Sequence, residues 1–194
     1  MLGVVLCGGQ SSRMGTDNGL IKLNANTWTQ AAVDKMLLLK LKVVLSVNAT
    51  QYNDYQSIFN TAQLIIDNDD LLVRGLLAGV LSVHLQYPEE DLFVLACDMP
   101  LMETNMLPQL LLAYREHPLN GAYIFFNDGQ PEPLCAIYTA KGLAFVLQLL
   151  KANELPKHNM KYVLEHIQPY TILLHEEQKK YFRNFNTHAE LNGL

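Results

Sequence analysis

The sequence predicts an α/β fold, in which a mostly parallel sheet carries helices on both of its faces. Short apolar runs alternate with stretches of helical spacing along most of the chain, and the connections between them are short. Hydrophobic residues make up 49% of the 194 residues, which is enough for one sizeable core and excludes a disordered chain. Since no linker-like segment interrupts the pattern, we expect a single domain over residues 1–194.

The alternation is clearest in the first hundred residues. Residues 2–7 form a continuous apolar run, which is typical of a strand covered on both faces. Further strands are predicted at 43–47, 63–66 and 92–96, and helices at 28–40, 52–59 and 76–85. Pro108 predicts that a helix following Glu103 is kinked or restarted.

The pattern changes near residue 121. Apolar runs at 121–126 and 133–138 flank the turn-forming residues Asn127–Gly129, which favours a hairpin or a pair of mixed strands. Helices over 141–150 and 159–166 and a strand over 170–174 are expected to follow, and residues 176–180 are expected on a solvated turn or helix face.

Charge and cysteine content narrow the classes of function. Fourteen basic against 19 acidic residues give a net charge of −5, and without a basic stripe a nucleic-acid partner is not expected. No apolar run is long enough for a transmembrane helix, and the N-terminus lacks signal-peptide features. Cys7, Cys97 and Cys135 show no CxxC spacing, which favours buried thiols in a reducing, cytoplasmic setting. The six histidines show no HxxxH spacing and are expected at the surface.

Candidate chemistry falls at three strand ends, because ligands of such sheets bind beyond the carboxyl ends of the strands. These places are Gly8–Gly9, Asp67 and Asp98. Paired glycines let backbone N–H groups approach phosphate oxygens, and Ser11 and Arg13 add donors. The loop is neither a Walker A loop nor GxGxxG, and a glycine pair alone is also typical of a plain turn.

The longer string from Leu6 to Leu20 resembles L-A-G-G-x-S-x-R-M-G-x-D-K-x-L, the signature of the molybdenum cofactor guanylyltransferases, the MobA-like nucleotidyltransferases. Four more segments resemble family patterns in the same order: 74–79 (G-P-L-A-G), 94–100 (C-D-x-P), 133–138 (P-L-x-x-x-Y) and 184–191 (N-x-N-T-P-E-x-L). The resemblance spans nearly the whole chain. It implies a single Rossmann-like three-layer domain of the nucleotide-diphospho-sugar transferase type, with residues 1–120 binding nucleotide and 121–194 binding the acceptor.

The resemblance also implies a reaction, in which GMP passes from Mg-GTP to the phosphate of molybdopterin and pyrophosphate leaves. In-line attack at the α-phosphorus depends mainly on positioning and charge neutralisation. Asp98 matches the family's magnesium carboxylate, so it is predicted to be both a catalytic residue and the ligand of Mg²⁺. Judged without the resemblance, Asp98 could also cap the helix that begins near Glu103.

Other residues match nucleotide positions of the family. Asp67 is predicted to accept hydrogen bonds from N1–H and N2–H₂ of guanine, although 67–70 is also a turn-forming cluster. The further predicted nucleotide contacts are Leu6, Cys7, Gly8, Gly9, Ser11 and Asn48. Asn184 and Asn186 match asparagines that the family places near the pterin, or they cap the last helix.

The chain departs from the signature at Asn18, where the family has a lysine that neutralises phosphate charge. Losing one preorganised charge donor typically costs ~10²–10³ in rate. Two hypotheses follow. In the first, Arg13 or Lys22 supplies the charge beside Asn18, and Lys22 is expected at an exposed position of a short strand. In the second, the chain is a nucleotide-binding homologue that no longer catalyses. A third hypothesis keeps the chemistry but uses CTP or another phosphorylated acceptor. Beyond GTP and molybdopterin, the resemblance implies an accessory GTP-binding protein, molybdoenzymes and a homo-oligomer as partners.

Overall fold

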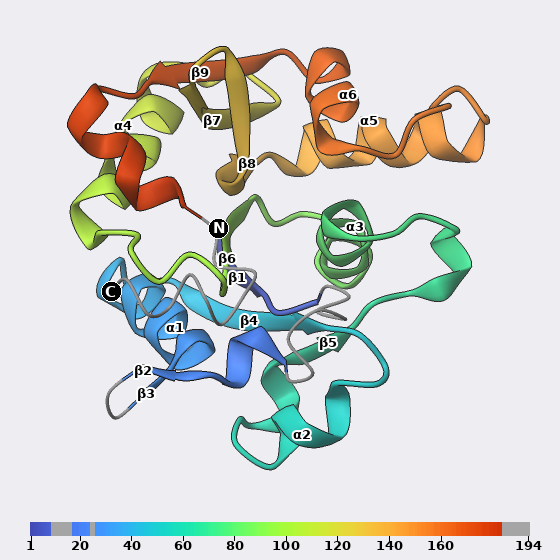
Figure 1. The fold of residues 1–194 in the computed structure, drawn as a ribbon. Helices are drawn as coiled ribbons and strands as arrows, with labels where there is room; N and C mark the ends of the chain where they lie inside the picture. The colour runs from blue at the N-terminus through green and yellow to red at the C-terminus, as the bar shows by residue number, and fades with distance from the viewer. Residues whose placement is uncertain (9–16, 24–25, 184–194) are drawn as a thin grey trace.

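One seven-stranded mixed sheet runs through the molecule (Figure 1). The computed structural model describes residues 1–8, 17–23 and 26–183. In spatial order the strands are β5 (Leu64–Ile66), β4 (Lys42–Val47), β1 (Leu2–Leu6), β6 (Leu92–Ala96), β8 (Gln130–Tyr138), β7 (Ala122–Asn127) and β9 (Pro169–Leu173). A separate two-stranded ribbon pairs β2 (Lys22–Leu23) with β3 (Asn26–Thr27).

The directions of the strands determine where the candidate site residues come together. β5, β4, β1 and β6 run parallel, and Leu6 lies opposite Ser46 on one side and Ala96 on the other. β8 is antiparallel to both β6 and β7, while β9 is again parallel to β7. The carboxyl ends of the four parallel strands therefore share one edge of the sheet.

Helices cover both faces of the sheet and make three layers (Figure 1). They are α1 (Trp28–Leu38), α2 (Tyr52–Gln56), α3 (Leu76–Gln86), α4 (Leu107–Glu116), α5 (Ala140–Lys151) and α6 (Met160–His166). Val5 and Phe93 pack in the core cluster that contains residues of α1 and α4. Val4 and Val94, one residue away on each strand, pack in the cluster that contains residues of α3, α5 and α6. This alternation explains why the strands read as continuous apolar runs.

Helix starts follow ordinary capping chemistry. Thr27 begins α1, its hydroxyl accepting a hydrogen bond from the Gln30 N–H at 3.1 Å, and Thr139 begins α5 in the same way. Pro108 lies in the first turn of α4, directly after a 3₁₀ turn at Thr104–Met106. The predicted restart of a helix after Glu103 is therefore confirmed.

The hairpin of β7 and β8 carries a local irregularity next to the candidate site. Asp128 and Gly129 close it with φ values of 47° and 79°, the positive angles that two-residue hairpin turns require. Ile124 lies opposite Ala136, whereas Phe125 lies opposite Glu132, so three extra residues bulge from β8. Leu134 lies in this bulge.

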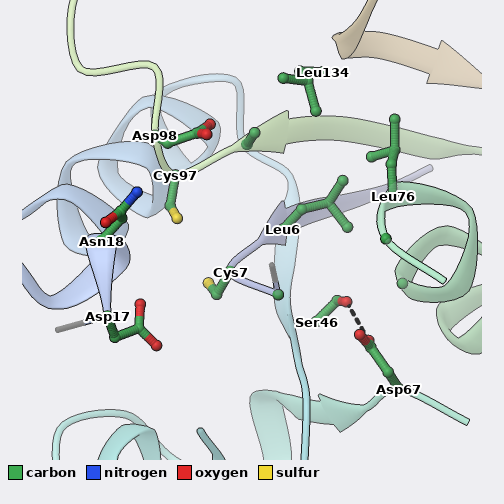
Figure 2. A pocket seen from close by; sticks show the side chains of 14 residues that line it. Leu6, Cys7, Asp17, Asn18, Ser46, Asp67, Leu76, Cys97, Asp98 and Leu134 are labelled. Carbon is green, nitrogen blue, oxygen red and sulfur yellow. Dashed lines mark hydrogen bonds between the residues drawn. The ribbon is translucent and has the colours of Figure 1, made fainter. Parts of the chain in front are cut away.

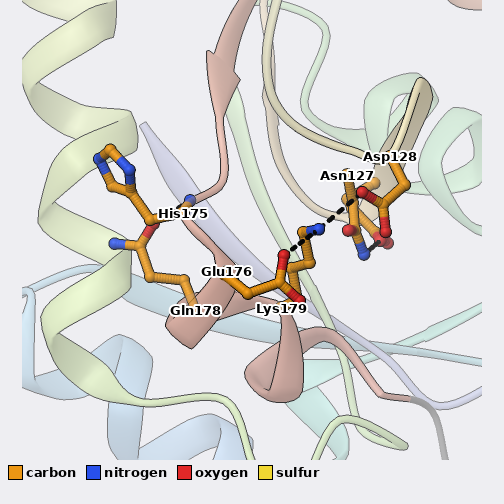
Figure 3. Close-up of polar contacts among 7 residues, drawn as sticks. Asn127, Asp128, His175, Glu176, Gln178 and Lys179 are labelled. Atoms are coloured by element: carbon orange, nitrogen blue, oxygen red, sulfur yellow. Dashed lines mark hydrogen bonds and ion pairs between the residues drawn. The ribbon is translucent and has the colours of Figure 1, made fainter.

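The segment after β9 is tied to that hairpin turn by one lysine (Figure 3). Within the 3₁₀ turn Glu176–Phe182, Lys179 Nζ donates to Asp128 Oδ1 at 2.7 Å and to the Glu176 carboxylate. Exposed ion pairs contribute little stability. The main anchor is Phe182, which is 5% exposed and packs edge-on against Phe125 with 5.0 Å between the ring centroids.

Most predicted elements are confirmed, with the largest differences at Gln56, where α2 ends early, and at Gln130, where β8 begins early. The three cysteines are buried free thiols, as expected. The prediction that His84 lies at the surface is wrong, because it is 2% exposed in α3, which packs between the sheet and α5. Within the ranges that the structure describes, no helix has the length and apolar character needed to cross a membrane.

Candidate active site

A cavity opens at the carboxyl ends of β1, β4, β5 and β6 (Figure 2). Three backbone hydrogen bonds draw these ends together: Cys97 N–H to the Leu6 carbonyl at 3.0 Å, Cys7 N–H to the Ser46 carbonyl at 2.9 Å, and Asp67 N–H to the Val47 carbonyl at 2.8 Å. The described lining consists of Leu6, Cys7, Gly8, Asp17, Asn18, Ser46, Asp67, Gly75, Leu76, Gly79, Ala96, Cys97, Asp98 and Leu134. Gly8, Asp67 and Asp98 thus share one cavity, although they are far apart in the sequence.

Asp98 stands just past the end of β6, and Figure 2 shows its carboxylate above Asn18 and Cys97. Its Oδ1 atom is buried, and no hydrogen-bond partner reaches it among the described residues. Burial raises the pKa of Asp98 above its usual value. The turn that starts at Thr104 has Glu103 as its N-cap residue, so Asp98 does not perform that capping role. A buried carboxylate oxygen without a protein donor is suited to a hard cation.

Asp67 stands at the end of β5, and its orientation is fixed by the neighbouring strand. Ser46 Oγ donates a hydrogen bond to Asp67 Oδ1 at 2.7 Å (Figure 2). Two glycines leave room for this pair: a Cβ at Gly79 would lie 2.5 Å from Ser46 Oγ, and a Cβ at Gly8 would lie 3.0 Å from Asp67 Oδ2. Burial raises the pKa of Asp67 to about 6, and the Ser46 hydrogen bond opposes that rise.

A second polar network holds Asp17 beside the cavity. Asp17 Oδ1 accepts hydrogen bonds from the Gly19 N–H at 2.8 Å and from the Tyr55 hydroxyl at 3.2 Å, and Oδ2 accepts one from Gln51 Nε2. Burial raises the pKa of Asp17, while these hydrogen bonds lower it. The sequence reasoning missed Asp17, Gln51 and Ser46. The signal for Asp17 was the aspartate of the signature, and the signal for Gln51 was its place three residues after Asn48, the spacing of a capping box.

Two cysteines, Cys7 and Cys97, line this cavity (Figure 2). Contact with the Cys7 thiol and full burial raise the pKa of Cys97 well above its usual value. Only a thiolate is a strong nucleophile. Cys97 therefore serves as packing rather than as a nucleophile.

The structure brings together six of the predicted site residues, namely Leu6, Cys7, Gly8, Asn18, Asp67 and Asp98. Asn48 is not among the described lining residues, and its Oδ1 accepts hydrogen bonds from the Gln51 N–H and the Thr50 hydroxyl instead. Lys22 is exposed on the β2–β3 ribbon and is likewise absent from the described lining. Gly9, Ser11, Arg13, Asn184 and Asn186 lie outside the described residues.

The charge of the described cavity lining is one-sided. Asp17, Asp67 and Asp98 contribute carboxylates, and no lysine or arginine lies among its described lining residues. Within the same described ranges, no three His, Cys, Asp or Glu side chains are grouped to hold a metal. A cation at Asp98 would therefore complete its shell with water and ligand oxygens.

Two solved structures share this architecture over nearly their whole length. Molybdopterin-guanine dinucleotide biosynthesis protein A from Archaeoglobus fulgidus superposes with a TM-score of 0.77 at 20% identity, over 100% of this chain and 96% of that one. CMP:2-keto-3-deoxy-manno-octonic acid synthetase, solved with CTP, superposes with a TM-score of 0.67 at 11% identity, over 99% and 95% of the two chains. These identities show the fold alone, and that fold is the nucleotide-diphospho-sugar transferase type that the family resemblance implies.

The fold and the strand-end cavity fit a nucleotidyltransferase, and the family model assigns the chain to that class. Residues 3–169 match the model of the MobA-like NTP transferase domain, and the chain belongs to this family. It is similar to two proteins named probable molybdenum cofactor guanylyltransferase. The one from Flavobacterium johnsoniae is 26% identical over 98% of this chain and 94% of its own length, and the one from a Geobacillus species is 28% identical over 100% and 97%.

Proposed function

We propose that this nucleotidyltransferase transfers GMP from GTP to the phosphate of molybdopterin and releases pyrophosphate. The observation that carries the proposal is the convergence of Gly8, Asp67 and Asp98 on one cavity at the carboxyl edge of the sheet. Support for the acceptor comes from the names of the Flavobacterium johnsoniae and Geobacillus relatives, which match nearly the full chain.

Magnesium fits the donor chemistry of the cavity. Three carboxylates and no described cationic side chain line it, so a bound triphosphate needs a counter-charge. Asp98 is the residue that would hold Mg²⁺, because its buried Oδ1 accepts no hydrogen bond from the described residues. Mg²⁺ is commonly bound by one or two carboxylates with phosphate oxygens and water, and when bound it neutralises phosphate charge.

The chain's own residues would orient the nucleotide. Asp67 Oδ2 can accept hydrogen bonds from the adjacent N1–H and N2–H₂ groups of guanine, a pair of donors that adenine lacks. Ser46 holds the other carboxylate oxygen, so the direction in which Oδ2 points is set before the base arrives. Gly8 carries no Cβ that could crowd Oδ2.

The reaction is tested with purified protein, molybdopterin, MgCl₂ and GTP, by measuring pyrophosphate release and formation of the guanine dinucleotide. Asp98→Asn is expected to lower kcat/KM by roughly 10²–10³ while the protein stays folded. Asp70→Asn, at an exposed position outside the cavity, is the matched control and should behave as wild type. If the wild type at high enzyme concentration releases no more pyrophosphate than Asp98→Asn does, the proposal is overturned.

A second candidate function is favoured by the one-sided charge of the described cavity lining. Asn18 occupies the position of the family's lysine, and the described lining contains no cationic side chain. A chain that binds GTP without turning it over would act as a nucleotide-binding homologue in cofactor assembly. Saturable GTP binding together with no pyrophosphate release at any enzyme concentration would support that role.

The choice of base is tested separately. Binding of GTP, CTP and ATP is compared in wild type and in Asp67→Ala. Preference for GTP should disappear in the variant, since the carboxylate is the group proposed to recognise guanine. Preference for CTP in the wild type would instead support a different nucleotide donor.

A further inference from the structure

We propose that Gln51 is a positioning residue for the nucleotide. Its buried side-chain amide hydrogen-bonds two segments that line the cavity and so fixes the distance between them. Gln51 is not among the described lining residues. It hydrogen-bonds Cys7 and Asp17, which line the cavity and directly precede the lining residues Gly8 and Asn18. The inference rests on the proposed nucleotide site. It adds a residue that neither the signature nor the strand-end rule identifies.

Every polar group of the Gln51 amide is used. Its Nε2 donates to the Cys7 carbonyl at 2.9 Å and to Asp17 Oδ2, and its Oε1 accepts the Asn48 N–H at 3.0 Å. The side chain is 8% exposed. Leaving such buried partners unsatisfied is costly, so the amide fixes three segments at once.

The Asp17 end of this contact is itself rigid. Its Oδ1 is held by the Gly19 N–H and by Tyr55, which is fully buried. Thr29 Oγ1 donates to the Gly19 carbonyl at 2.9 Å from the first turn of α1. A Cβ at Gly19 would lie 2.1 Å from the Tyr55 hydroxyl, so only glycine allows this close approach.

The Cys7 end is equally constrained. The Cys7 N–H is bonded to the Ser46 carbonyl, so the strand end cannot shift without breaking the sheet. Since Gly8 follows Cys7 and Asn18 follows Asp17, the Gln51 amide sets the distance between these two parts of the wall.

The test replaces Gln51 by methionine, which keeps the length and removes the amide donors and acceptor. Gln56→Met is the matched control, because Gln56 is exposed on the neighbouring helix α2 and its amide bonds to Asn53 on the same helix. Gln51→Met is expected to raise the Kd and KM for GTP roughly tenfold while kcat at saturation changes less than about threefold. Gln56→Met should match wild type.

A pairwise rescue separates positioning from general destabilisation. Gln51→Glu places a second carboxylate against Asp17 and should weaken GTP binding more than Gln51→Met. Adding Asp17→Asn restores an amide donor opposite the introduced carboxylate and should recover part of that loss. GTP affinity of Gln51→Met within about twofold of wild type, or a loss confined to kcat, would overturn the inference.

A measurement on the wild type without nucleotide keeps this inference distinguishable from the proposed function. The Asn48 and Gly19 amide protons donate to Gln51 and Asp17, so their hydrogen exchange should be slow. Exchange of both at the unprotected rate would overturn the positioning role even where GTP binds. Slow exchange together with absent GTP binding would uphold the contact and overturn the nucleotide function on which its role rests.

Discussion

Ser46 Oγ donates a hydrogen bond to Asp67 Oδ1 at 2.7 Å, between neighbouring parallel strands at the edge of the cavity. Ser46 is 1% exposed and Asp67 is half-buried, so the carboxylate meets protein on one side and the cavity on the other. Burial at this position disfavours the ionised carboxylate and raises the pKa of Asp67 to about 6. Nucleotide binding and pH should therefore be coupled at this residue.

Ser46→Ala should shift the pH dependence of GTP binding to higher pH. Only the ionised carboxylate accepts hydrogen bonds through both oxygens, so wild-type affinity should fall as pH drops through about 6. Without the serine donor the ionised form is less favoured, and the midpoint should rise by roughly one pH unit. GTP titrations between pH 5 and 8 measure this shift. Ser57→Ala, at an exposed serine, should leave the midpoint where it is, and an unmoved midpoint in Ser46→Ala would contradict the assignment.

Asp67→Asn should stabilise the protein at pH 7 and do so much less at pH 4. The pKa of Asp67 is about 6 in the folded chain and 3.8 for the unperturbed group, so between these values the folded state keeps a proton that the unfolded state has lost. Stability therefore falls as pH rises through that window, and above it the ionised group costs up to about 3 kcal/mol. Urea unfolding at both pH values tests this. An equal effect of Asp67→Asn at pH 4 and pH 7 would show that the ionisation of Asp67 is not its cause.

Gly79→Ala should destabilise the protein, although this change within a helix usually stabilises by about 1 kcal/mol. The added Cβ would lie 2.5 Å from Ser46 Oγ and 3.1 Å from Leu6 Cδ2. Ser46 must then rotate away from Asp67 or the helix must move, at a cost of about 1–3 kcal/mol. Unfolding in urea gives the stability change, and the pH midpoint of GTP binding should rise as in Ser46→Ala. A net stabilisation would contradict the close approach of helix and strand.

The strand ends were predictable because their signals are local. Apolar runs fix the positions of β1, β4 and β6, and parallel strands bring Gly8, Asp67 and Asp98 to one edge whatever the side-chain details. Gln51 and Ser46 were not predictable, because their roles depend on register. Gln51 reaches Cys7 across 44 positions of the sequence, and Ser46 reaches Asp67 across 21. No periodicity within a short window contains these pairs.

The burial of His84 could not be predicted from the local sequence either. A lone histidine near the end of an apolar helix is expected to face solvent, but α3 is covered by the sheet on one side and by α5 on another. Burial lowers the pKa of His84 and so favours its neutral form. The local sequence indicates one apolar face, whereas the tertiary structure buries several.

Asn18→Lys should increase turnover, because the cavity has three carboxylates and no lysine or arginine in its described lining. A lysine at this position would place a charge donor between Asp17 and Asp98, where Figure 2 shows the Asn18 side chain. A preorganised charge donor aimed at a developing negative charge is typically worth ~10²–10³ in kcat. Asn18→Gln, which is longer but neutral, controls for length, and pyrophosphate release at saturating GTP is the measurement. Turnover in Asn18→Lys that does not exceed that of Asn18→Gln would mean that the wild-type chain already draws its cationic charge from elsewhere, and loss of activity in Lys22→Ala would then identify Lys22 as the source.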